Sequence, residues 1–133
     1  MSEFLDDYVN FVDSVTSDNS KRSDAFFDAL DSIEEKGIAP ERILTASIGM
    51  ASEAGEFSDI IKKIVFQGKE VNEETIRHLK LEIGDVMWYI AQACMALNVS
   101  LEEVIRMNIE KLEKRYPGGF DKIKSNNKDS KDL

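Results

Sequence analysis

Two short acidic signatures hold the residues whose types and spacing can do chemistry. Each contains two carboxylates three positions apart: Glu53 and Glu56 in the first, Glu82 and Asp85 in the second. Residues three apart are neighbours on a helix surface, so each pair shares one face of its helix. Four carboxylates on two helices form an oxygen-only ligand set, which hard divalent cations prefer. The spacing therefore predicts a divalent-cation site between two helices.

An ordinary interpretation competes with this one. Charged residues make up 32% of the chain, and most carboxylates on helices are simply solvated. The helical wheel favours the cation site, because Glu53 and Glu82 each border the apolar stripe of their helix rather than lying opposite it. Burying so much like charge without a cation is costly. We expect the stripes to be Ile43, Ser47, Met50, Ala54, Phe57, Ile61 and Ile64 in the first helix, and Ile76, Leu79, Ile83, Met87, Ile90, Cys94 and Leu97 in the second.

A glycine stands inside each signature, Gly55 in the first and Gly84 in the second. Glycine within a helix costs about 1 kcal/mol relative to alanine, so two at matching places indicate a packing or functional reason. We expect them to permit close approach of the two helices.

The hydrophobic pattern predicts an all-α fold, an antiparallel bundle of about five helices, with no strand of period two. The helices are expected over residues 3–15, 24–36, 40–66, 73–97 and 101–115. Residues 1–120 are expected to form a single helical domain, and residues 121–133 a polar, flexible tail. The expected helix caps are Ser23 or Asp24, Asn72 and Ser100, and the expected stops are Gly37, Gly68 and Pro117.

Composition narrows the choice of partners and compartment. The net charge is −9, with 26 acidic and 17 basic residues, which argues against a nucleic-acid partner because phosphate contacts need clustered Lys and Arg. No apolar run approaches membrane-spanning length, so no membrane partner is expected. Cys94 is the single cysteine, which indicates a reducing, cytoplasmic setting. Leu81 and Trp88 lie away from the core stripe, and this predicts a second buried surface and an oligomer.

Three residues near the signatures each allow two interpretations. His78 is the single histidine; it is either a polar neighbour of Glu82 or a group that supports this ligand, and a di-iron site is excluded because it would need two Glu-x-x-His pairs. Lys63 belongs either to a solvated face or to a phosphate contact. Tyr89 is either half-buried packing or a stacking surface for a base.

Three segments of the chain resemble one known family. The first two are "ASEAGEFSDIIKK" and "LEIGDVMWYIAQAC", which contain the acidic signatures, and the third is the closing "NIEKLEKRYPGGF". They resemble the MazG-like branch of the all-α nucleoside triphosphate pyrophosphohydrolases, in its small single-domain form from phages and bacteria. The resemblance covers roughly residues 44–120, and the first forty residues match no motif.

This resemblance implies a Mg²⁺-dependent enzyme, in which Mn²⁺ can replace Mg²⁺, that hydrolyses (deoxy)nucleoside triphosphates to the monophosphate and pyrophosphate. Glu53, Glu56, Glu82 and Asp85 match the metal ligands of the family, and Glu56 is our choice for the group that accepts the proton of the attacking water. The resemblance also implies a homodimer or homotetramer, in the host cytoplasm if the chain is phage-encoded. It further implies phosphate contacts from Lys63, Lys111 and Arg115, and sugar or base contacts from Tyr89, Asn108 and Tyr116.

Several alternatives stay open. The same superfamily contains dUTPases and phosphoribosyl-ATP pyrophosphohydrolases, although the RYPGGF ending favours the MazG branch. A non-enzymatic helical oligomer with a structural divalent ion would carry the same acidic pairs. For the substrate we favour dGTP or dCTP, and both a house-cleaning and a nucleotide-pool role fit the chemistry.

Overall fold

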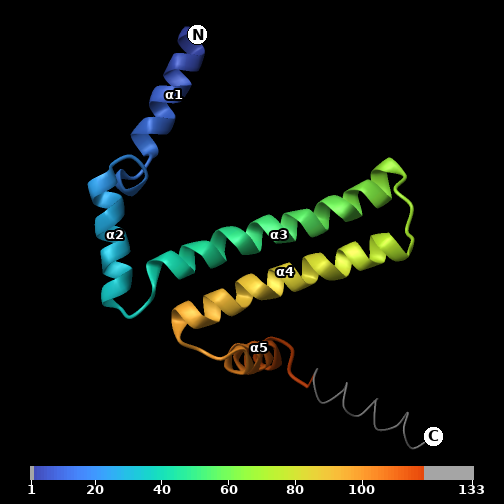
Figure 1. Ribbon diagram of the computed structural model, residues 1–133. Coiled ribbons are helices and arrows are strands. Elements are labelled where there is room, and N and C mark those ends of the chain that lie inside the picture. Colours follow the sequence, from blue (N-terminus) through green and yellow to red (C-terminus); the bar gives the residue numbers. More distant parts are fainter. Residues whose placement is uncertain (1, 119–133) are drawn as a thin grey trace, which may run out of the picture. The chain divides into compact units, whose positions relative to one another are not determined.

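A computed structural model describes residues 2–118 of the chain, and these residues form five α-helices with no strand among them. The all-α prediction is confirmed. The predicted tail at 121–133 lies outside the described residues. The elements are α1 (Glu3–Val15), a short 3-10 helix η1 (Asp18–Ser20), α2 (Ser23–Glu35), α3 (Pro40–Gln67), α4 (Glu73–Leu97) and α5 (Leu101–Arg115) (Figure 1).

The two longest helices, α3 and α4, lie side by side as an antiparallel hairpin (Figure 1). Gly68 ends α3 in the left-handed conformation, with φ 69°, which glycine adopts at no steric cost. Asn72 caps α4, because its Oδ1 accepts a hydrogen bond from the Thr75 backbone N–H at 2.9 Å. The buried Thr75 hydroxyl also donates to the Glu70 carbonyl at 2.7 Å. These bonds fix the turn that aligns the two helices.

The buried face of α3 differs from the stripe that the helical wheel predicted. Ser47, Ala54 and Ile61 were expected inside but are exposed, whereas Ala46 and Ile60 are buried. Two packed helices touch along one narrow strip of residues, which we call the contact lane. In α3 this lane passes through small side chains that let the two backbones approach.

The same correction applies to α4. Ile76, Ile83, Met87 and Leu97 were expected inside but are exposed in this chain. Cys94 is buried as predicted. Glu82 is buried as well, and therefore belongs to the contact lane itself instead of bordering it.

The glycine of closest approach is Gly49, and not the two glycines of the acidic signatures. A methyl group placed at Gly55 or Gly84 would have no described neighbour within 4 Å, so the prediction that these two permit close approach is wrong. At Gly49 the same methyl group would overlap the Cδ1, Cε1 and Cζ atoms of the Tyr89 ring. The Tyr89 side chain therefore packs directly against the backbone of α3.

The predicted caps have mixed outcomes. Ser100 caps α5, with its Oγ accepting from the Glu103 backbone N–H at 3.1 Å. At α2 the cap position is Arg22, with no side-chain cap, so the prediction of Ser23 or Asp24 is wrong. Asp24 instead lies within the first turn, where one carboxylate oxygen forms an ion pair with Arg22 at 2.7 Å and the other accepts a hydrogen bond from the Ala25 backbone N–H at 2.9 Å.

The chain divides into two compact units between Leu97 and Asn98. The first contains α1 to α4 and the second contains α5, and each is described by itself. The single domain over residues 1–120 stays a prediction. None of the helices in the described part of the chain is both long and apolar enough to cross a membrane.

Candidate active site

Three carboxylates of the two signatures meet across the α3–α4 hairpin. Glu53 comes from α3, and Glu82 and Asp85 come from α4; one oxygen of each lies within 4.8 Å of the others. Glu82 is buried, Glu53 is half-buried and Asp85 is exposed. The cluster therefore begins inside the helix contact and opens to solvent, so that a cation held by its inner oxygens would still be reachable by a ligand.

Glu82 is the innermost member of the cluster. Only 8% of the residue is exposed, and its Oε2 is buried without a hydrogen-bond partner among the described residues. Its other oxygen, Oε1, lies 3.2 Å from Nε2 of His78. A buried carboxylate oxygen without a partner costs free energy. This donor set, with one inner oxygen unsatisfied, fits a bound divalent cation.

Electrostatics in the cluster point the same way. The pKa of Glu53 is raised, first by the adjacent side chain of Glu82, then by desolvation and by the charges of Glu82, Asp85 and Glu56. Carboxylates this close to one another disfavour the ionised form. A divalent cation between them would relieve the same repulsion.

Glu56 lies outside this group of three oxygens. It is exposed on α3, although its charge still contributes to the raised pKa of both Glu53 and Lys63. The structure therefore brings together three of the four predicted metal ligands and leaves the fourth beside them.

Lys63, a predicted phosphate contact, is engaged by a neighbour on its own helix. Its Nζ lies 2.8 Å from Asp59 Oδ2, and Lys62 lies 3.5 Å from the other oxygen. This contact with Lys63 lowers the pKa of Asp59 and raises that of Lys63. The pair is solvent-exposed and so contributes little to stability, which leaves the lysine free to exchange Asp59 for another anion.

Two aromatic rings stand next to the carboxylates. Trp88 and Tyr89 line an open cavity of about 320 Å³ together with Glu53 and Asp85. The rings meet edge to face, with centroids 4.9 Å apart and an interplanar angle of 84°. Sequence reasoning placed Tyr89 here but missed Trp88, and it missed Gly49, against which the Tyr89 ring packs. The signal for Gly49 was its place one turn before Glu53, where a small residue leaves room for a facing ring.

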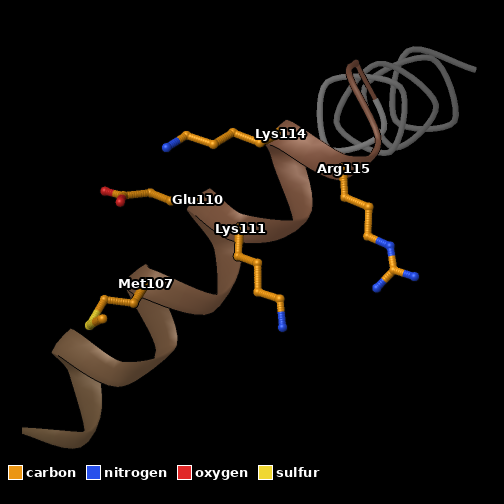
Figure 2. Close-up of a pocket in the computed structure, with 5 residues that line it drawn as sticks. All are labelled: Met107, Glu110, Lys111, Lys114 and Arg115. Carbon is orange, nitrogen blue, oxygen red and sulfur yellow. The ribbon is translucent and has the colours of Figure 1, made fainter.

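The remaining predicted contacts belong to the second unit. Lys111 and Arg115 line a cavity of about 500 Å³ on α5, with Met107, Glu110 and Lys114. Figure 2 shows Lys111 and Arg115 extending to one side of the helix, while Lys114 and Glu110 extend to another.

Asn108 and Tyr116 are exposed residues of the same unit. Asn108 shares the helix face of Lys111 and Arg115, since residues three and four apart are neighbours, and the Arg115 guanidinium lies 5.7 Å from the Tyr116 ring centre. These four groups therefore lie in the second half of α5 and at the residue that follows it.

The α3–α4 hairpin and its carboxylate cluster, which opens to solvent, define the class of protein: a helical protein with oxygen ligands for a divalent cation. Comparison of sequences then identifies its family. The profile of the MazG nucleotide pyrophosphohydrolase domain matches residues 42–120. That match spans more than half of the chain, so the chain belongs to the MazG family, and nucleotide pyrophosphohydrolysis is its class of activity.

A relative is found among phage proteins. The Gene 37 protein of Mycobacterium phage L5 is 37% identical to this chain over 81 residues, which are 59% of this chain and 70% of that protein. No solved structure matches the chain.

Proposed function

We propose that the protein hydrolyses (deoxy)nucleoside triphosphates between the α and β phosphates, with Mg²⁺ as cofactor and Mn²⁺ as a substitute. The observation that carries this proposal is the meeting of Glu53, Glu82 and Asp85, whose oxygens lie within 4.8 Å of one another inside a MazG domain. Hard oxygen ligands suit these two cations.

The carboxylates need the cation before they can accept such a substrate. A triphosphate is strongly anionic, and acidic side chains alone would repel it. When bound, the cation neutralises phosphate oxygens and stabilises the departing pyrophosphate. Glu53, Glu82 and Asp85 hold it, and Glu56 completes the set or accepts the proton of the attacking water. Glu56 suits the second role because it is exposed and stands outside the oxygen cluster.

Basic and aromatic side chains complete the proposed substrate site. Lys63, Lys111 and Arg115 contact the phosphates, and for the α5 pair the support is their common side of the helix (Figure 2). Tyr89 contacts the base, because its ring lines the cavity beside the carboxylates. Asn108 and Tyr116, on the helix end that carries Arg115, contact the sugar or base. Among nucleotides we favour dGTP or dCTP.

We further propose that the protein works as a homodimer or homotetramer. Its support is the amount of apolar surface left open on the hairpin, since no large side chain in the described chain is fully buried. Such surface marks an interface in a stable protein. The open side chains on the hairpin include Ile48, Val65, Phe66, Leu81, Trp88 and Met95.

The proposed setting is the cytoplasm, that of the host if the chain is phage-encoded. Cys94 is a free, buried thiol, as expected of a protein kept reduced, and a relative comes from a phage. The net charge of −9 supports the absence of a nucleic-acid partner.

A pyrophosphate-release assay across standard and modified nucleoside triphosphates, with and without Mg²⁺, tests the proposal. We expect release that requires the cation and is highest with dGTP or dCTP. Activity confined to dUTP or to phosphoribosyl-ATP would reassign the protein to a sister activity. Metal binding without pyrophosphate release from any triphosphate would contradict an enzymatic role.

A further inference from the structure

His78 stands one turn before Glu82 on α4, on the same face of the helix. Its Nε2 lies 3.2 Å from Glu82 Oε1, the distance of a close polar contact. The two side chains differ in exposure: that of His78 is 51% exposed and that of Glu82 is 11% exposed. The imidazole therefore reaches from the solvent edge of the helix to the most buried carboxylate of the cluster.

The two oxygens of Glu82 are in different environments. Oε1 faces His78, whereas Oε2 is buried and has no hydrogen-bond partner among the described residues. A carboxylate with one oxygen held by a donor has a fixed orientation, and the other oxygen is then presented in one direction. The Glu82 carboxylate that carries this second oxygen lies in the cluster with Glu53 and Asp85.

We propose that His78 is a positioning residue for the cation site, holding Glu82 through Nε2 so that Oε2 is directed at the cation. The inference rests on the proposed function, because it needs a cation between the carboxylates. It assigns the Nε2–H tautomer to His78, the form that donates to a carboxylate oxygen. The role depends on the donor and its position, and not on a charge on the ring.

A plain surface contact is the alternative. Exposed ion pairs one helical turn apart contribute little to stability, and a contact of that kind would leave cation affinity unchanged. A partner that orients a metal ligand acts on affinity instead, and its loss typically weakens binding about 10- to 100-fold. Affinity for the cation therefore separates the two.

The experiment measures Mn²⁺ binding to the full chain by electron paramagnetic resonance, without nucleotide. His78→Leu removes the donor, His78→Gln keeps an N–H donor on a flexible side chain, and Arg77→Gln changes the neighbouring exposed residue. We expect His78→Leu to weaken Mn²⁺ binding about 10- to 100-fold. His78→Gln should recover most of this loss, and Arg77→Gln should bind within about twofold of the unmodified protein because screening weakens an exposed charge.

A second readout separates positioning from general damage. At saturating Mn²⁺ the His78→Leu protein should regain most of its kcat, since only the metal concentration needed for activity has changed. Circular dichroism should show unchanged helicity, because His78 is half exposed.

Failure of this inference and of the proposed function are distinguishable. If the unmodified protein binds Mn²⁺ and His78→Leu binds it equally tightly, the positioning role of His78 is wrong and the cation site stands. If the unmodified protein binds no Mn²⁺, the cation site itself is wrong and the role of His78 falls with it.

Discussion

The α3–α4 hairpin and α5 build their functional groups in different ways. In the hairpin, Glu53 meets Glu82 and Asp85 only because two helices pack together. On α5, Lys111 and Arg115 share a side through helical periodicity alone (Figure 2). The acids are thus preorganised by tertiary packing, and the neighbouring acids raise the pKa of Glu53. The basic residues are organised only locally, so their contribution depends on where α5 is held in the working assembly.

The largest expected effect comes from removing a charge in the hairpin cluster. Glu82→Gln or Asp85→Asn should reduce cation-dependent hydrolysis more than about 100-fold, beyond the typical loss for a residue that only supports a ligand. Mn²⁺ binding should fall with it, while helicity measured by circular dichroism stays unchanged. Glu74→Gln is the matched control, because Glu74 is an exposed acid of the same helix whose described ion pair is a distant 3.9 Å contact with Arg77. Equal activity in Asp85→Asn and Glu74→Gln would show that the carboxylates of the hairpin are not part of the active site.

A smaller effect of another kind is expected from α5. Lys111→Ala and Arg115→Ala should each raise KM for the triphosphate about tenfold, the loss of one charge-assisted hydrogen bond of about 1.5 kcal/mol. Mn²⁺ binding in the absence of nucleotide should not change. Lys114→Ala serves as the control, because it removes the same charge from a residue that lines the same cavity but extends to another side of α5 (Figure 2). Identical KM values in all three variants would show that triphosphate binding depends on the net charge of α5 and not on the positions of Lys111 and Arg115.

Gly49 tests the packing that preorganises the hairpin. Gly49→Ala forces the Tyr89 ring to move, and overpacking of this kind costs about 1–3 kcal/mol of stability. Because Tyr89 lines the cavity beside the carboxylates, kcat/KM should fall as well. Gly55→Ala is the control: its added methyl group meets no described atom within 4 Å, so the variant should gain about 0.5–1 kcal/mol from the better helix former. Chemical denaturation and steady-state kinetics measure both. A Gly49→Ala protein as stable as Gly55→Ala would contradict the close Tyr89 contact.

The smallest expected effect is on how the stability of the metal-free protein depends on pH. Because the pKa of Glu53 is raised in the folded chain, the folded state holds this proton more tightly than the unfolded state does. Stability contributed by the protonated group is therefore present at low pH and is lost as pH rises through the raised pKa. The Glu53→Gln variant has a neutral amide at this position and therefore does not lose this stability as pH rises.

Thermal unfolding in EDTA and in Mn²⁺ measures this effect. Without metal at neutral pH, Glu53→Gln should have a higher Tm than the unmodified protein, and the difference should shrink toward acid pH. Added Mn²⁺ should reverse the order, since the variant lacks a ligand. A lower Tm for the metal-free variant at neutral pH would show that Glu53 is stabilised by its surroundings instead of repelled.

The bounds of the helices were predictable because their signals are local. Gly68, Asn72 and Ser100 act on the residues next to them, and the predicted ends match the structure closely. The capping of α2 was not predictable in this way, because the cap position is Arg22, which provides no side-chain cap, and Ser23 and Asp24 already belong to the first turn.

The contact lane of the hairpin could be predicted less well. Apolar residues surround much of α3 and α4, so the helical wheel could not tell which part faces the neighbouring helix and which faces other surfaces. The choice is made by close approach at Gly49 and by Tyr89, which are far apart in sequence. For the same reason Glu82 was expected at the edge of the lane and lies within it. The acidic spacing nevertheless predicted which side chains would meet, since three of the four do.

The most direct test of the central claim is the identity of the products formed from dGTP. Phosphorus NMR of a reaction with Mg²⁺ should show dGMP and pyrophosphate appearing together in equal amounts, and neither should form in EDTA or with Asp85→Asn. Formation of dGDP and inorganic phosphate, or product formation that persists without a divalent cation, would contradict the account.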